Sequence, residues 1–165
     1  MKRRGLTAGL ALLTGAVLLA SAPASLAEAW RRGGFYLFSR DFLEEIPRRL
    51  TGPGRFRFLL QPLLASILGV RSGREDARAG RPPFLAGVLF HPDQRKLLLA
   101  SAFGSIVHLL LMGILLDSLF QWVLFGTSYP GAALVVGPVL ITVPYAVARA
   151  LSNRAAPRLR REEHP

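Results

Sequence analysis

The apolar residues of this chain are gathered into long blocks instead of being spread at the spacing of an element with one buried face. The most apolar blocks are residues 6–20, 56–70, 97–125 and 131–151, and polar segments separate them. Elements of a soluble domain repeat their apolar positions about every 3.6 or 2 residues, whereas a helix that crosses a bilayer needs about 20 successive apolar residues. The pattern predicts an all-α fold, a small polytopic transmembrane helical bundle with an interfacial amphipathic helix.

Residues 97–151 form the clearest predicted element, a transmembrane helical hairpin. As a helix, residues 97–125 would measure about 43 Å, so they must tilt or begin in the interface, and residues 131–151 would measure about 31 Å, close to the hydrocarbon thickness. The short turn between them makes an antiparallel pair, with Trp122 and Tyr129 placed as aromatic residues of the outer interface. The prediction of membrane residence rests on this hairpin.

The first 27 residues have two interpretations. Basic residues at positions 2–4 precede an apolar run, and small residues up to Ala27 occupy the positions that a signal peptidase inspects. Residues 5–27 would also measure about 34 Å as a helix, which is enough to span a membrane. We therefore predict that residues 1–27 are either a signal peptide or a first transmembrane helix, and the sequence leaves both open.

The middle of the chain continues with two membrane-associated segments. In residues 28–55, Phe35, Phe38, Phe42 and Ile46 recur at steps of three and four, which predicts an amphipathic helix lying in the interface. The next block, residues 56–70, would measure about 22 Å as a helix, less than the thickness of the hydrocarbon core. It is predicted to be a short transmembrane or re-entrant helix.

The positions of basic residues favour a crossing by residues 56–70. Basic residues collect on the cytoplasmic side of a membrane, so the basic elbow at residues 71–96 and the basic tail at residues 152–165 are both expected there. The chain starts on that side, crosses outward with its first block and must then return before the elbow. One feature opposes this topology, because seven Arg residues between Arg31 and Arg57 would then lie outside.

The elbow also carries a candidate binding surface. Its basic residues can bind the headgroups of anionic lipids, which attract Lys and Arg near the membrane surface. The alternative is a solvated charged loop in which Glu75 and Asp76 pair with part of the positive charge. The candidate lipid contacts are Arg71, Arg74, Arg78 and Arg81.

Composition excludes several other classes of protein. The chain has 21 Lys and Arg against 10 Asp and Glu, a net charge of +11, but its positive residues lie beside the apolar blocks and not in one patch. We therefore interpret them as signals for orientation and headgroup contact and expect no nucleic-acid partner. The chain contains no Cys, which excludes thiolate catalysis and Cys-based metal sites. Because no phosphate loop, nucleophile elbow or metal-ligand motif is present, we predict no catalytic residue, cofactor or metal.

Asp117 is the most unusual residue of the predicted membrane helices. A carboxylate inside the bilayer costs roughly 3 kcal/mol on insertion scales and often marks a function. Gln121 lies one turn further and shares its face, and Thr142 is expected at a similar depth in the following helix. This candidate intramembrane polar site could bind a proton or cation, or it could fix helix packing. We favour packing, because a single carboxylate without a charged partner makes a poor relay.

Several runs of residues resemble a set of uncharacterised small multi-pass inner-membrane proteins of proteobacteria. The runs lie within residues 54–154 and are Gly54-Arg55-Phe56-Arg57, Leu60-Gln61-Pro62, Asp76-Ala77-Arg78-Ala79-Gly80-Arg81-Pro82-Pro83 and Tyr129-Pro130. The resemblance implies a location in the bacterial envelope. It adds no activity, because that set has no assigned function.

Together these features predict an integral membrane protein that is a non-enzymatic accessory or assembly component. The first alternative is a small oligomeric transporter or channel that uses Asp117, and the second is a membrane-embedded enzyme. The expected partners are the lipid bilayer, including anionic lipid, and either another membrane protein or further copies of the chain. The expected location is the bacterial inner membrane, with several crossings and a cytoplasmic C-terminus.

Overall fold

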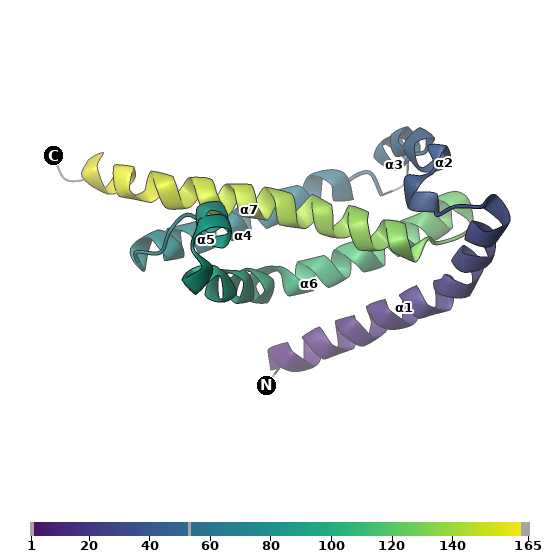
Figure 1. Ribbon diagram of the computed structural model, residues 1–165, viewed down its shortest axis with the longest axis horizontal. Helices are drawn as coiled ribbons and strands as arrows, with labels where there is room; N and C mark the ends of the chain where they lie inside the picture. Colours follow the sequence, from purple (N-terminus) through teal and green to yellow (C-terminus); the bar gives the residue numbers. More distant parts are fainter. Residues whose placement is uncertain (1, 53, 163–165) are drawn as a thin grey trace. The chain divides into compact units, whose positions relative to one another are not determined.

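A computed structural model describes residues 2–52 and 54–162, and Figure 1 shows their fold coloured from purple α1 to yellow α7. Within these residues the chain is helical and has no strand, so the predicted all-α fold is confirmed. The elements are α1 (Lys2–Arg32), the 3₁₀-helix η1 (Tyr36–Phe38), α2 (Arg40–Glu44), α3 (Ile46–Thr51), α4 (Arg57–Arg78), α5 (Phe84–Phe90), α6 (Pro92–Phe125) and α7 (Pro130–Glu162).

Three helices of the described chain are long and apolar enough to cross a membrane. The segments are Gly5–Arg32 of α1, Pro92–Phe125 of α6 and Pro130–Ala156 of α7, with mean hydropathies of 1.9, 2.1 and 1.9. Such helices are those of a multi-pass membrane protein, and α6 and α7 are the two helices of the predicted hairpin. Helix α4 is not among the three, and whether residues 56–70 span the membrane stays a prediction.

The chain divides into two compact units that do not follow the order of the sequence. The first unit consists of residues 1–59 and 108–139, and the second consists of residues 60–107 and 140–165. Helices α6 and α7 therefore each contribute one half to either unit. The segment boundaries predicted from the sequence concern topology and not packing, and they stay predictions.

In the first unit, short elements follow α1 where the sequence predicted one amphipathic helix. Gly33 ends α1 with a φ of 70°, a conformation that favours glycine, and the amide of Gly34 donates to the carbonyl of Ala29 at 3.1 Å. A new helix begins at Ser39, whose hydroxyl accepts from the amide of Phe42 at 3.3 Å. Pro47 then lies in the first turn of α3. These local signals divide residues 28–55 into η1, α2 and α3.

In the second unit, α4 presents two faces of opposite character. Its buried face carries small and polar residues, and its exposed face begins with leucines. The buried residues are Gln61, Ala65, Gly69, Ser72, Gly73 and Asp76, and the exposed apolar residues are Leu60, Leu63, Leu64 and Ile67. This arrangement is the reverse of a helix in a soluble protein. It is typical of membrane helices, which pack through small and polar residues and turn apolar residues to lipid.

Helix α4 also continues beyond the boundary that the sequence predicted at residue 70. It ends at Arg78, and Gly80 follows with a φ of 65° while the amide of Arg81 donates to the carbonyl of Asp76 at 2.9 Å. This is the usual glycine closure of a helix end. The first part of the predicted elbow is therefore helical and extends both faces of α4.

Candidate functional site

Two aspartates are completely buried, one in each unit. Asp117 lies on α6 in the first unit and Asp76 lies on α4 in the second, and both are 0% exposed. Burying a carboxylate is costly unless cations and hydrogen-bond donors surround it. Each of these carboxylates is paired with arginines from elsewhere in the chain. We call the two groups the Asp117 network and the Asp76 network.

In the Asp117 network, two arginines from separate elements converge on one carboxylate. Oδ1 of Asp117 forms ion pairs with Arg57, the first residue of α4, and with Arg49 of α3, the latter at 3.5 Å. The side amide of Gln121 donates to Oδ2 at 2.5 Å, and its oxygen accepts from the amide of Tyr129 at 2.8 Å. The polar pair expected from sequence is thus joined to two cations.

Aromatic rings enclose the guanidinium of Arg49. Its central carbon lies 5.8 Å from the ring centre of Tyr36, 5.6 Å from that of Phe42 and 5.1 Å from that of Phe125. Its Nη2 also donates to the hydroxyl of Tyr36 at 3.0 Å, and that hydroxyl donates to Glu45. Aromatic faces attract a cation that has lost its water, so this arrangement compensates for the burial of Arg49.

The hairpin turn is tied to the end of α1. The rings of Tyr36 and Tyr129 stack with centres 3.7 Å apart, and the hydroxyl of Tyr129 donates to Glu28 at 3.0 Å. Burial, followed by this hydrogen bond, raises the pKa of Tyr129 from about 10 to about 12. Further along α1, Thr7 and His108 share a hydrogen bond of 2.7 Å. Helix α1 is therefore held to α6 and to the turn at several levels.

The sequence reasoning treated Asp117 as a carboxylate without a charged partner, and this was wrong. Its partners lie 60 and 68 positions earlier in the chain, in segments assigned to the interface and to the next block. The available signal was the excess of arginines between Arg31 and Arg57, which opposed the positive-inside trend. Two of those arginines, Arg49 and Arg57, are buried against Asp117 and do not face either aqueous side as free charges.

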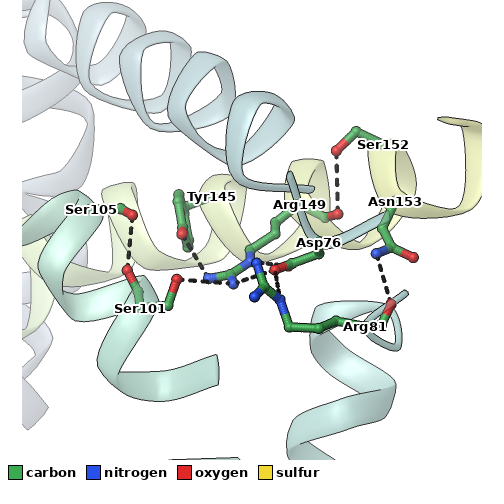
Figure 2. A network of polar contacts seen from close by, with 8 residues as sticks. All are labelled: Asp76, Arg81, Ser101, Ser105, Tyr145, Arg149, Ser152 and Asn153. Atoms are coloured by element: carbon green, nitrogen blue, oxygen red, sulfur yellow. Dashed lines mark hydrogen bonds and ion pairs between the residues drawn. The ribbon is translucent and has the colours of Figure 1, made fainter. Parts of the chain in front are cut away.

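The Asp76 network joins α4, α6 and α7 within the second unit, as Figure 2 shows. Arg149 of α7 holds the carboxylate of Asp76 with two hydrogen bonds, from Nε to Oδ2 at 2.6 Å and from Nη2 to Oδ1 at 3.0 Å. Its remaining donors reach the hydroxyl of Tyr145 at 2.9 Å and Oγ of Ser101 at 3.3 Å. Phe84 of α5 covers the guanidinium at 4.7 Å.

Arg81 belongs to the same network and is not a free surface charge. Its Nε donates to Oδ1 of Asp76 at 2.8 Å, and its carbonyl accepts from Asn153 at 3.2 Å, as the right side of Figure 2 shows. Its side chain is 32% exposed. Of the four predicted lipid contacts, Arg81 is therefore the one whose charge is already neutralised by a buried partner.

The other three predicted lipid contacts lie together on the surface. Arg71, Arg74 and Arg78 border a groove of about 570 Å³ along α4, which Ile67 and Val70 also line. Arg71 forms an ion pair with Glu75 at 3.3 Å, and both side chains are largely exposed. Within the described part of the chain, no carboxylate is within ion-pair distance of the other two arginines.

Thr142 is placed in the second unit, whereas Asp117 and Gln121 belong to the first. The structure therefore brings two of the three predicted intramembrane polar residues together, and the contribution of Thr142 to their site stays a prediction. In residues 2–52 and 54–162 no group of three or more His, Asp or Glu side chains is arranged to hold a metal ion.

Comparison of the chain with protein-family models, with curated proteins and with solved structures gives no match. The functional argument therefore rests on the two buried networks and on the exposed face of α4.

Proposed function

We propose that this protein is a non-enzymatic component of a bacterial inner membrane that binds anionic lipid headgroups through Arg71, Arg74 and Arg78 of α4. One observation carries the proposal: these arginines continue the exposed face of α4 that begins with leucines. Positions 60, 63, 64, 67, 71, 74 and 78 recur at steps of three and four, so they share one side of the helix. Along that side the residues change from apolar to cationic.

The order of these residues matches the depth profile of one leaflet. The helix rises about 10 Å from Leu60 to Ile67 and about 10 Å from Arg71 to Arg78. Apolar side chains in the first part face acyl chains, and the arginines reach the level of the phosphates. A guanidinium binds a phosphate through two parallel hydrogen bonds, which makes Arg well suited to this contact.

The charge of the three arginines is available to a ligand. The exposed pair between Arg71 and Glu75 contributes little to stability, and it leaves most donors of Arg71 free. Each basic residue near an anionic surface adds about 1 kcal/mol of binding. Three arginines on one face therefore supply about 3 kcal/mol, a preference of roughly a hundredfold for anionic over zwitterionic lipid.

The Asp117 network supports a structural role for that residue over a transport role. A carboxylate that carries a cation or proton through a membrane needs a site that the ion can enter. Asp117 is instead buried against Arg49, Arg57 and Gln121, which compensate its charge and join α3, α4 and α6. This favours an accessory or assembly component over a channel that uses Asp117.

The proposed topology places the three arginines in the cytoplasmic leaflet, where anionic lipids are enriched. The basic segments on either side of the hairpin support this orientation, and so does the resemblance to proteobacterial inner-membrane proteins. The C-terminus is cytoplasmic in the same topology.

Native mass spectrometry of the detergent-purified full chain tests the proposal. The protein is titrated with phosphatidylglycerol and with phosphatidylcholine, and the bound lipid is counted. We expect a preference for phosphatidylglycerol that falls roughly a hundredfold in the variant Arg71→Gln/Arg74→Gln/Arg78→Gln. The control Arg40→Gln/Arg48→Gln/Arg55→Gln removes the same charge from exposed positions of the first unit. Equal losses in the two variants would overturn the proposal.

A further inference from the structure

A hollow of about 480 Å³ lies between α1 and the last turns of α6 within the first unit. On the α1 side it is lined by Val17, Ala20 and Ala24, which recur at steps of three and four and so share one face of that helix. On the other side are Leu115 and further residues of α6 and of the hairpin turn. The small side chains on α1 leave the space that the hollow occupies.

The lining is apolar except for hydroxyl groups. No charged side chain borders the hollow, so its chemistry suits a ligand with an apolar body and an uncharged polar group. Leu115, Leu119 and Trp122 of α6 supply much of the apolar surface.

Two of the hydroxyl groups at the hollow are buried without a hydrogen-bond partner. Ser118 is 1% exposed and Ser128 is 6% exposed, and within the described residues neither Oγ has a partner. Ser21, which also borders the hollow, differs because its hydroxyl donates to carbonyls of its own helix. An unpaired buried hydroxyl costs free energy that a ligand with acceptor oxygens would recover.

The length of the hollow matches the depth of one leaflet. From Leu115 to the end of α6 at Phe125 the helix rises about 15 Å, half of the roughly 30 Å hydrocarbon core. The turn next to Ser128 lies at the interface end, where the ester groups of glycerolipids are found, and Leu115 lies at the deep end. The polar and apolar parts of the lining thus follow the polarity of a lipid.

We propose that this hollow holds one acyl chain of a glycerolipid, whose ester carbonyls accept hydrogen bonds from Ser118 and Ser128. The site is independent of the arginine face of α4, because it lies in the other unit and uses no charge. It requires that α1 stays on the mature protein, since α1 supplies one wall.

The first test fills the hollow from the α1 side. The full chain is reconstituted in phosphatidylcholine vesicles that contain a small fraction of the same lipid with a photoreactive acyl chain, and labelled peptides are mapped. We expect labelling concentrated on residues 17–24 and 115–128, and a fall of about fivefold or more in Ala20→Phe/Ala24→Phe, because two rings occupy the space of the chain. The control Ala8→Phe/Ala11→Phe changes exposed alanines of α1 that do not border the hollow.

The second test addresses the ester carbonyl. Retention of an ester-linked phosphatidylcholine is compared with that of its ether-linked analogue, which lacks the carbonyls, by native mass spectrometry of the purified chain. We expect the ester lipid to be retained about threefold to tenfold better, the range for one or two neutral hydrogen bonds, and the difference to vanish in Ser118→Ala/Ser128→Ala.

Labelling that is uniform along α1, or equal retention of the two lipids by the unchanged protein, would overturn the proposal. An intact mass that lacks residues 1–27 would overturn it too, because the wall formed by α1 would be missing.

Discussion

Asp76 and Arg149 form a two-pronged ion pair between α4 and α7 in which both side chains are 0% exposed. The two residues are 73 positions apart. Every donor of the guanidinium that reaches a described partner points toward α4, α6 or Tyr145, as Figure 2 shows. A buried pair of this kind adds little net stability relative to apolar residues, but removing one partner leaves an uncompensated charge.

We predict that Asp76→Asn and Arg149→Met each lower the free energy of unfolding by about 3–5 kcal/mol. Unfolding in mixed detergent micelles measures this loss. The double variant Asp76→Asn/Arg149→Met should lose less than the sum of the two single losses, because neither charge is then left alone. Arg71→Gln breaks an exposed pair with Glu75 and should cost less than about 1 kcal/mol. Strictly additive losses in the double variant would refute the coupling.

The contact between α4 and α7 depends on two glycines. A Cβ atom at Gly69 would lie 2.5 Å from the carbonyl oxygen of Tyr145, and one at Gly73 would meet Ser152 and the backbone of Arg149. Alanine at either position must push the helices apart, so we predict that Gly69→Ala and Gly73→Ala each cost about 1–3 kcal/mol.

Gly104 of α6 is the matched control for these glycines. It also lies inside a helix of the second unit, but a Cβ there would meet nothing within 4 Å. Gly104→Ala should stabilise the protein by about 0.5–1 kcal/mol, because alanine favours the helix. If all three alanine variants stabilise the protein in the same unfolding assay, the close approach of α4 and α7 is not formed.

The sequence predicted the helices well and the partners of the buried charges poorly. Block hydrophobicity located the hairpin of α6 and α7, because a bilayer imposes a minimum apolar length on each helix. The same reasoning placed Asp76 in a solvated loop, because Asp76 and Arg149 are far apart in the sequence and no local rule pairs them. The arginine excess between Arg31 and Arg57 showed that a topology rule failed, but not that Asp117 was the reason.

Tyr129 is expected to make the hairpin turn sensitive to alkaline pH. Its pKa is raised to about 12, first by burial and then by its hydrogen bond to Glu28, so the folded protein favours the neutral phenol. This stabilisation is fully present below pH 10 and is lost as the pH rises toward 12. Phenolate absorbance during an alkaline titration should show a late step that is missing in Tyr129→Phe and shifted to lower pH in Glu28→Gln. A Tyr129 that titrates near pH 10 in the folded protein would contradict the burial of its hydroxyl.

Asp117→Asn separates a packing role from a transport role. The change leaves Arg49 and Arg57 buried without their carboxylate, and we predict a loss of about 3–5 kcal/mol in unfolding free energy. The variant Arg57→Met/Asp117→Asn removes one of these cations as well and should recover part of that loss. Proton or cation flux into vesicles should stay at the level of protein-free vesicles for the unchanged chain. A flux that the unchanged chain supports and Asp117→Asn abolishes, with the fold intact, would favour the channel.

The topology of α4 determines on which side of the membrane the C-terminus lies. Helices α1, α6 and α7 alone make three crossings, which would place residues 34–91 and the C-terminal tail on the same side. A fourth crossing by α4 instead places Arg40 on one side and Ala79 and Ala155 on the other. Because the chain has no native Cys, single cysteines at these three exposed positions can be labelled by a membrane-impermeant maleimide without background. We predict that, in spheroplasts, Arg40→Cys is labelled from outside, whereas Ala79→Cys and Ala155→Cys react only after the membrane is opened. Labelling of all three from the same side would show that α4 does not cross, and it would remove the arginine face of α4 from the cytoplasmic leaflet.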